Sequence, residues 1–433
     1  MKIAIIGAGA AGCFCAVELK RRLPSASVDV FESGAKALAK VAVTGGGRCN
    51  LTNSFEGISS LSAAYPRGDK LMKRLFRSFD HNDTVRWFEN EGVRLVLQED
   101  YCFFPASQDA MQIVRTLLSG MRLAGVSLHT RRRVSRVSRL SDGRFSLDFS
   151  AVSVPSAHSA AAADERPDAL FPGVRNGLEF DVVVVTTGGS PKVSGLGMID
   201  GLGLEIVPPV PSLFTFNLPG SPVRELMGAV VENVSASLAG TKFKASGPLL
   251  VTHWGMSGPA ILKLSSYAAR YLADNEYSAT LCVNWFGELD EQSVRNVLAG
   301  MSSANSRKLI LNTHPADLPA RLWEYLAQKC GIREDARWAE LGVKGMNRLV
   351  NTLTNDEYRV CGKSRFKEEF VTCGGVALSN VNPNTLESKA HPGLYFAGEV
   401  LDVDAITGGF NLQAAWTMGY TVARAIADRY ASR

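Results

Sequence analysis

The chain has 433 residues, 46% of them hydrophobic, and a formal net charge of +5. This composition is ordinary for globular proteins, argues against intrinsic disorder, and leaves room for two or three domains. No segment offers the roughly 18 uninterrupted apolar residues that a membrane helix needs. Lys2 and the apolar run after it imitate a signal peptide, but glycines interrupt the run and no AxA-like cleavage site follows. We therefore expect a cytoplasmic protein with no membrane partner.

The cysteines and the basic residues exclude two further classes of site. The eight cysteines form no CxxC pair and no Cys/His cluster at zinc spacing, so we expect reduced thiols and no metal. The basic run HTRRRVSRVSRL, residues 129–140, reads as the solvated edge of a β-hairpin. Because no aromatic platform is interleaved with its charges, we expect no nucleic-acid partner.

The N-terminus carries a nucleotide-binding pattern. An apolar run, Ile3 to Ile6, predicts a strand, and Gly7, Gly9 and Gly12 follow it at the start of a helical pattern. In this context GxGxxG allows a tight turn, close approach of the backbone to a pyrophosphate, and close packing of helix on strand. A second strand, VDVFE, ends in Glu32, at the spacing of an acid that hydrogen-bonds a ribose hydroxyl. Together these features predict an adenine dinucleotide.

The C-terminal region decides between NAD and FAD. A short strand, Leu394 to Ala397, leads into Gly398 and Glu399, an acidic loop with Asp402, and Gly408-Gly409 at the start of a long helix. In two-part FAD sites a late acid reaches the ribityl hydroxyls, and a helix N-terminus faces the flavin pyrimidine and favours its reduced, negative form. The strand of residues 180–191 also ends in glycines. Three such strand ends predict FAD.

Several motifs then resemble the BaiN/RdsA-like NAD(P)/FAD-dependent oxidoreductases, a flavoprotein family that includes aminoacetone oxidase. The resemblance runs almost end to end. It is carried by GAGAAG (7–12), Lys40 with TGGGRCNLTN (44–53), FFPAS (103–107), THWGMSGPA (252–260), VTCGGV (371–376) and LESKAHPGLYFAGEVLDVDAITGGFNLQAAW (386–416). Two departures are visible: Cys102 replaces an expected basic residue, which puts an anion-binding role of the FFP turn in doubt, and Ala405 replaces a common glycine, which we expect to be tolerated.

The resemblance and the patterns together predict an α/β fold, with a Rossmann-like, two-part FAD-binding domain of the glutathione reductase type. Residues 1–190 and 372–433 form this discontinuous domain. Short strands punctuated by proline and glycine predict an inserted β-barrel over 191–256 and 355–371, and helical patterns predict a subdomain over 257–354. We assign no chemistry to the small-residue segment 150–177. No second GxGxxG follows a strand, so a nicotinamide must reach the flavin directly.

By resemblance, the TGGGRCNLTN loop lies along the pyrophosphate and the flavin ring, where glycine lets backbone N–H groups come close. Arg48 then neutralises phosphate or flavin charge. The predicted FAD-binding residues are Gly7, Gly9, Ala10, Ala11, Gly12, Glu32, Lys40, Thr44, Gly45, Gly46, Gly47, Arg48, Cys49, Asn50, Val134, Thr187, Gly188, Gly189, Gly398, Glu399, Asp402, Gly408, Gly409, Phe410, Asn411 and Leu412.

Cys49 needs a separate interpretation. Disulfide reductases of the glutathione type place a CxxxxC redox pair in the corresponding loop, but here the second position is Ser54. Without a resolving partner, we predict a packed or flavin-adjacent thiol that takes no part in thiol relay chemistry.

The candidates for substrate chemistry are His253, beside Trp254 in a glycine-rich turn, and Tyr101, before the FFP turn. Each has a plainer alternative, since such a histidine often serves as a structural hydrogen-bonding group and such an aromatic side chain often packs in a core. Lys363 and Arg365 fit either an anionic substrate or an ordinary exposed charge run.

The predicted function is FAD-dependent hydride transfer between a small organic substrate and flavin, with NADH or NADPH as a transient partner of a reductase. An amine-type oxidase that uses dioxygen is the alternative. More distant alternatives are a non-catalytic flavin-binding or sensing protein and FAD-dependent RNA modification. The sequence does not indicate an oligomeric state.

Overall fold

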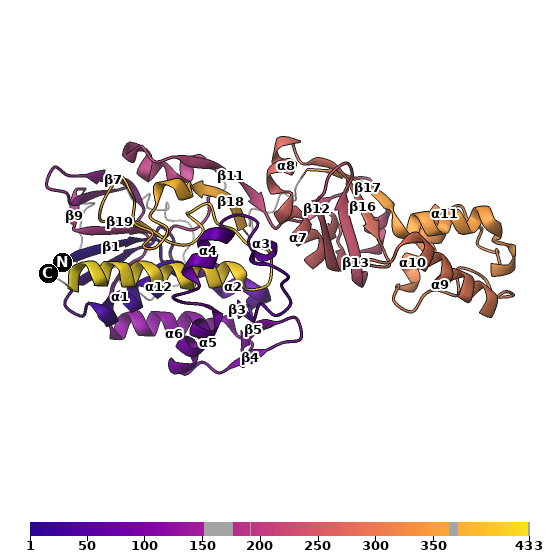
Figure 1. Cartoon of the computed structure of the whole chain (residues 1–433), viewed down its shortest axis with the longest axis horizontal. Coiled ribbons are helices and arrows are strands. Elements are labelled where there is room, and N and C mark those ends of the chain that lie inside the picture. The colour runs from indigo at the N-terminus through magenta and orange to yellow at the C-terminus, as the bar shows by residue number, and fades with distance from the viewer. Residues whose placement is uncertain (151–175, 191, 363–370, 432–433) are drawn as a thin grey trace, which may run out of the picture. The chain divides into compact units, whose positions relative to one another are not determined.

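The computed structural model describes residues 1–150, 176–190, 192–362 and 371–431, and the chain divides into two compact units (Figure 1). The first unit comprises residues 1–209 and 372–433, and the second comprises residues 210–371. Lys363, Arg365 and most of the segment 150–177 lie outside the described residues. No helix among the described residues is both long and apolar enough to cross a bilayer.

A five-stranded parallel sheet organises the first unit, in the order β19-β10-β1-β2-β6. Its strands are β1 (Lys2–Ile6), β2 (Ser27–Phe31), β6 (Ser127–His129), β10 (Val182–Val185) and β19 (Leu394–Phe396). The central strands read KIAII and VVVV because their residues are buried on both faces of the sheet. The register pairs Val185 with Phe396, so the last strand of the chain completes the sheet that the first strand begins.

The basic run 129–140 differs in part from its prediction as a hairpin edge. His129 ends β6 and pairs in parallel with Phe31. Only the part from Val134 forms an antiparallel edge, where β7 (Val134–Arg139) pairs with β8 (Phe145–Phe149). The sequence did not predict β6 as a strand of the parallel sheet, because β6 has only three residues and its pairing partner lies about a hundred residues earlier.

Two long helices cover one face of the parallel sheet. α1 (Ala10–Arg22) and α12 (Phe410–Ala431) run alongside each other through the first unit (Figure 1). A Cβ on Gly419 of α12 would lie 2.9 Å from the carbonyl oxygen of Ala11, so glycine permits this close approach. The other elements of this unit are α2 (Ala39–Gly47), β3 (Thr52–Asn53), α3 (Leu61–Ala64), α4 (Asp69–Leu75), α5 (His81–Asn90), β4 (Leu95–Leu97), β5 (Cys102–Pro105), α6 (Ala110–Leu123), β9 (Leu178–Phe180), η1 (Val193–Leu202) and η4 (Leu378–Asn380). The paired strands β11 (Ile206–Ser212) and β18 (Val371–Val376) each include the residues at which the chain passes from one unit to the other.

The second unit is built on a six-stranded antiparallel sheet in the order β12-β15-β14-β13-β16-β17. Its strands are β12 (Phe216–Asn217), β13 (Val230–Leu238), β14 (Lys244–Val251), β15 (Gly255–Ser257), β16 (Ser278–Asn284) and β17 (Asp356–Cys361). Its helices are η2 (Pro222–Leu226), α7 (Pro259–Tyr267), α8 (Ala269–Asp274), α9 (Glu291–Ala304), α10 (Ala320–Lys329), η3 (Trp338–Glu340) and α11 (Gly342–Thr354). One continuous core, which contains Trp285, Trp323 and Trp338, joins this sheet to α9, α10 and α11.

Asp356 links the sheet of the second unit to α10. Its carboxylate is buried and accepts a hydrogen bond from Trp285 Nε1 at 3.0 Å, and others from the Tyr358 hydroxyl and Lys329 Nζ. Burial, with the nearby Asp356 charge, raises the pKa of Tyr358 well above its usual value, so the phenol stays a donor.

We expect Asp356→Ala to lower the free energy of unfolding of the second unit by about 3 kcal/mol, because two buried donors lose their acceptor. Urea denaturation followed by tryptophan fluorescence measures the effect. Asp317→Ala removes an exposed carboxylate from the same unit and should change stability by less than about 0.5 kcal/mol. Equal losses in the two variants would contradict this role of Asp356.

Candidate cofactor site

The predicted glycine-rich turns meet at the carboxyl edge of the parallel sheet. The N–H of Gly7 donates to the carbonyl oxygen of Phe31 at 2.8 Å, which joins the ends of β1 and β2. Thr186, just after β10, donates from Oγ1 to the carbonyl oxygen of Gly7 at 2.8 Å. A Cβ on Gly398, after β19, would lie 3.1 Å from the Cβ of Ala11. The turns after all four strands therefore form one continuous surface.

The three glycines of GxGxxG differ in what they contact. A Cβ on Gly7, at φ +108°, would lie 2.5 Å from the carbonyl oxygen of Thr186, and one on Gly12 would lie 2.1 Å from the carbonyl oxygen of Gly7. Around Gly9, by contrast, no atom of the described residues comes within 4 Å of a Cβ. Packing thus requires Gly7 and Gly12, whereas Gly9 faces open space at the helix N-terminus, where a pyrophosphate needs bare backbone.

Glu32 is held at the end of β2 by backbone donors. Its carboxylate accepts from the N–H of Ala8 at 3.0 Å and from the N–H of Gly34 at 2.6 Å. These two bonds orient the carboxylate beside the GxGxxG turn, and its remaining lone pairs can accept from ribose hydroxyls.

The segment of residues 44–53, which we call a loop, departs from helical geometry at Thr44, near the end of α2. Its three glycines have the backbone conformation that was predicted for them. Gly45, Gly46 and Gly47 lie at φ of +58°, +68° and +83°, a left-handed region in which glycine is favoured. A Cβ on Gly46 or Gly47 would meet no atom of the described residues within 4 Å. The Arg48 side chain is exposed, and its guanidinium lies 4.6 Å from the centre of the Phe104 ring. This loop therefore offers open backbone beside a cation.

The same loop packs against the beginning of α12. Asn53 Nδ2 donates to the carbonyl oxygen of Gly408 at 3.1 Å, and Trp416 Nε1 donates to the carbonyl oxygen of Leu51 at 3.0 Å. A Cβ on Gly409 would lie 2.6 Å from Asn50 Oδ1. That oxygen is buried and has no hydrogen-bond partner among the described residues. A buried acceptor without a partner, beside a helix N-terminus, suits a ligand that carries an N–H group.

A short segment, residues 64–68, fixes the loop that leads into α12. The Tyr65 hydroxyl donates to the carbonyl oxygen of Phe410 at 2.8 Å, and the N–H of Ile406 donates to the carbonyl oxygen of Ala64 at 2.9 Å. The Arg67 guanidinium makes a two-bond ion pair with the buried carboxylate of Asp404. Sequence reasoning missed this segment, because AYPRG contains no motif and its partners lie about 340 residues later.

Lys40 and Glu399, predicted from separate motifs, lie together. Lys40 Nζ is 3.7 Å from Glu399 Oε2, and Glu399 Oε1 accepts from the N–H of Thr372 at 2.7 Å. A Cβ on Gly189, after β10, would lie 2.4 Å from Glu399 Oε1. Val134, in contrast, is a buried residue of β7 that pairs with Phe149 in a separate three-stranded sheet.

Both departures from the family pattern fit the structure. The buried Cys102 Sγ lies 3.5 Å from Asn53 Nδ2 and 3.6 Å from the carbonyl oxygen of Gly408, so a thiol packs where a charge was expected. Ala405 does not adopt a positive φ, and its N–H and carbonyl are both bonded by the Asn411 side chain. Alanine is thus accommodated without backbone strain.

The two candidate catalytic residues belong to different units. Tyr101, in the first unit, has a φ of +63°, and its half-exposed ring lies against Gly57. His253, in the second unit, has its ring centre 4.4 Å from that of Trp254, and its carbonyl accepts from Arg224 Nε at 2.7 Å. These contacts support the structural interpretation of His253 as much as a catalytic one.

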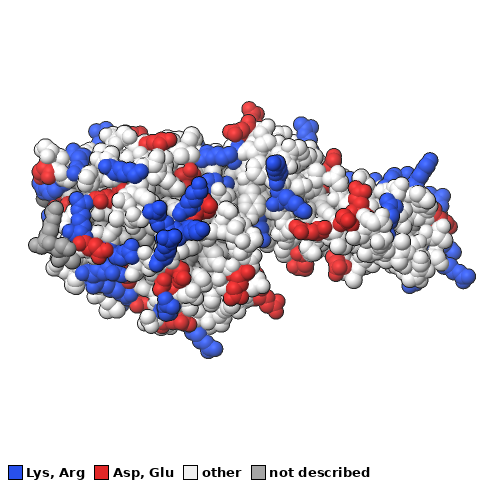
Figure 2. Space-filling model, viewed as in Figure 1, with Lys and Arg blue, Asp and Glu red and all other residues white. Residues whose placement is uncertain are grey.

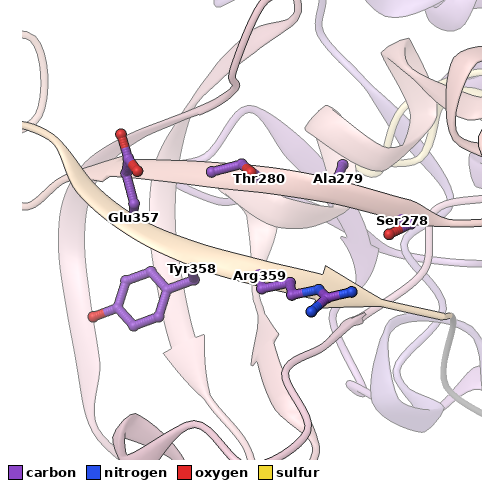
Figure 3. Close-up of a pocket in the computed structure, with 6 residues that line it drawn as sticks. All are labelled: Ser278, Ala279, Thr280, Glu357, Tyr358 and Arg359. Atoms are coloured by element: carbon purple, nitrogen blue, oxygen red, sulfur yellow. The ribbon is translucent and has the colours of Figure 1, made fainter.

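A separate hollow lies across β16 and β17 in the second unit (Figure 3). Ser278, Ala279 and Thr280 line it from one strand, and residues 357–359 line it from the other. Glu357 and Tyr358 point to opposite sides of β17, as neighbouring residues of a strand do (Figure 3). None of the residues predicted for cofactor or substrate lines this hollow.

Comparison with known proteins identifies the family. The model of the HI0933-like protein Rossmann domain matches residues 1–165, and that of the HI0933-like barrel and H2TH domain matches residues 210–371. A ribosomal RNA dihydrouridine synthase of Escherichia coli K12 is 30% identical over 433 residues, which cover 97% of this chain and 96% of that protein. This chain belongs to the HI0933-like family.

Two further relatives span similar lengths. A 3-dehydro-bile acid delta(4,6)-reductase of Clostridium scindens is 27% identical over 440 residues and covers 99% of both chains. A ribosomal RNA dihydrouridine synthase of Haemophilus influenzae is 29% identical and covers 98% of this chain and 97% of that protein. The solved structure of a 3-ketosteroid-delta4-(5alpha)-dehydrogenase of Rhodococcus jostii is 13% identical and matches with a TM-score of 0.48. The match covers 98% of this chain and 96% of that one.

Membership in the HI0933-like family confirms the predicted resemblance, the fold class and the flavoprotein oxidoreductase class. The carboxyl edge fits FAD on its own geometry. Gly9, Gly46 and Gly47 leave open backbone, Glu32 is oriented by two backbone N–H groups, and Asn50 Oδ1 is an unpaired acceptor beside α12.

The first prediction distinguishes a glycine that leaves space for the ligand, Gly9, from one that is required for packing, Gly12. Gly9→Ala should fold normally and bind FAD at least about tenfold more weakly, because the new methyl group enters the open space above the turn. Gly12→Ala should instead lower the melting temperature of the protein, since its methyl group would overlap the Gly7 carbonyl. Flavin titration and thermal unfolding of both variants provide the measurements. Unchanged FAD affinity in Gly9→Ala would contradict the assignment.

The second prediction concerns Cys49, whose buried side chain has its pKa raised to about 12 by desolvation. Its thiolate is therefore scarce below pH 9, and the folded protein should resist iodoacetamide at this position. Cys49→Ser should keep bound flavin and at least about half of the turnover, which absorbance and steady-state assays measure. Loss of turnover with intact flavin would show that the thiol takes part in the reaction.

Proposed function

We propose that this protein is an NAD(P)H-linked, FAD-dependent reductase of an activated carbon–carbon double bond. The observation that carries the proposal is the pair of activities named for its full-length relatives. One is a delta(4,6)-reductase and two are dihydrouridine synthases, so their substrates differ in size and polarity. Both names describe the addition of two hydrogens to a carbon–carbon double bond. The shared chemistry, rather than either substrate, is what we transfer to this chain.

The proposal assigns binding and electrostatic roles to the residues at the carboxyl edge. When bound, FAD supplies hydride transfer from the reduced nicotinamide to an electron-poor carbon of the substrate. Gly9 and the loop of residues 44–47 expose backbone N–H groups to the pyrophosphate. The N-terminus of α12 would lie toward the flavin pyrimidine and would stabilise negative charge there. Tyr101 and His253 remain the candidates for the group that donates a proton to the other carbon of the double bond.

The domain organisation bears on how the proposed electron donor reaches the flavin. Among the described residues, GxGxxG follows a strand only at Gly7 to Gly12, so a separate nicotinamide domain has no counterpart there. We infer that NADH or NADPH reaches the flavin directly and leaves before the substrate binds, which predicts ping-pong kinetics.

A second candidate is reduction of a uracil base within ribosomal RNA. It is favoured by the two dihydrouridine synthases, which are 30% and 29% identical to this chain over nearly its whole length. From the sequence we expect no nucleic-acid partner, because the net charge is modest and no aromatic platform is interleaved with the basic run 129–140, and RNA modification is a distant alternative.

Anaerobic stopped-flow measurements test the proposal. Addition of NADH or NADPH should bleach the flavin band at about 1 to 1000 per second, and an electron-poor enone or an unmodified ribosomal RNA transcript should then restore it. An amine that bleaches the flavin, with reoxidation by dioxygen, would instead establish the oxidase alternative. Bleaching by none of these reductants would favour a flavin-binding or sensing protein.

A further inference from the structure

The helix α4 carries a compact group of exposed cations. Lys70, Lys73 and Arg74 lie at positions i, i+3 and i+4, which share one face of a helix, and Arg77 lies in the turn that follows the helix. All four side chains are exposed. The apolar residues of the helix, Leu71, Met72 and Leu75, are buried on the opposite face. We call these four cations the α4 face. Figure 2 shows blue side chains gathered over this part of the first unit.

The α4 face has no acidic partner within the described part of the chain. Among the described residues, none of its four cations comes within 4 Å of a carboxylate, and Arg74 donates to Asn384 Oδ1 at 3.1 Å. Of the flanking acids, Asp69 makes no ion pair with Lys70 or Lys73, and Asp80 accepts from the N–H groups of Asn82 and Asp83. The charges are thus directed to solvent and available to an external anion.

Helix stability accounts for only part of this charge, because Asp69 lies four residues before Lys73, a spacing that can offset one like-charge pair. Like charges at i, i+3 and i+4 destabilise a helix by a few tenths of a kcal/mol per pair. For Lys73 and Arg74 the helix dipole offsets part of this repulsion, because both lie in the last turn, where the dipole favours cations. Lys70 lies in the first turn, where the dipole opposes it. A polyanionic ligand would compensate all of these charges together.

We propose that the α4 face binds the phosphate backbone of RNA. The inference rests on the proposed function, in the form in which the reduced base belongs to ribosomal RNA. α4 packs against α12 and directly follows the segment 64–68 that fixes the loop into α12. RNA bound to α4 is therefore held on the same unit as the predicted cofactor site.

The composition of the face favours RNA over a membrane surface. A helix that lies in a bilayer interface needs apolar side chains free to enter the lipid. Those of α4 are buried in the protein, and its exposed side is cationic. Lys and Arg without exposed apolar neighbours are typical of contacts to phosphates, which position a nucleic acid without reading its sequence.

The test uses the full chain with FAD bound and an unmodified ribosomal RNA transcript. The variant K70Q/K73Q/R74Q removes three charges from the α4 face. The matched control R122Q/K242Q/K344Q removes three exposed cations that are scattered over the chain. Fluorescence anisotropy at several salt concentrations gives the affinity and its salt dependence, and bound FAD and melting temperature verify that each variant is folded.

The α4 variant should bind RNA about tenfold or more weakly at 0.1 M salt. Its plot of log affinity against log salt should be shallower by about 2, since each phosphate contact contributes about 0.7 on single strands. The control should change affinity less than about threefold. Equal losses in both variants, or wild-type binding to anionic vesicles or polyglutamate as tight as to RNA, would overturn the assignment.

The reductase proposal and the RNA-binding proposal can be contradicted independently of each other. NAD(P)H bleaching of the flavin, measured on the same preparations, reports on the reductase without RNA. Bleaching with RNA affinity that does not depend on the α4 face would overturn this inference alone. RNA binding through the α4 face in a protein that no nicotinamide reduces would uphold the surface and overturn the reductase.

Discussion

The pairing of β19 with β10 is the constraint on which the first unit depends. These strands are about 200 residues apart, and their parallel register places Gly398 and Glu399 beside the turns that follow β1 and β10. The strand ends lie at one edge because all five strands are parallel. Each turn alone is a common feature of α/β proteins. Their convergence at one edge creates a continuous surface of bare backbone, which a dinucleotide needs and a single βα turn cannot supply.

The position of α12 follows from that pairing and from two further segments. The loop of residues 50–53 bonds to Gly408 and to the α12 side chains, and the segment 64–68 holds the approach to the helix through Tyr65 and Arg67. Asp404, six residues before α12 begins, is buried, and Arg67 balances its charge. Under our assignment, the positive end of the helix is then free to stabilise charge on the flavin.

Much of this fold could be predicted from local patterns. Residue type and spacing are enough to predict three features: GxGxxG after an apolar strand, an acid after the next strand, and glycines at the start of a C-terminal helix. Glu399 was predicted from the strand that precedes it and Lys40 from the family resemblance, but no spacing argument would have paired them. The segment 64–68 could not be predicted, because AYPRG is an ordinary turn and Arg67 finds Asp404 only through tertiary packing. No sequence motif marks Asp356 either, since its partners Trp285 and Lys329 reach it only through tertiary packing.

Hydrogen exchange of the protein with and without FAD tests the central claim, that the carboxyl edge of the parallel sheet holds the cofactor. The account predicts that FAD slows exchange of the backbone N–H groups in residues 7–12, 44–50 and 398–412, and leaves the second unit's sheet unchanged. Protection confined to the second unit, or no protection of these three segments by saturating FAD, would contradict it.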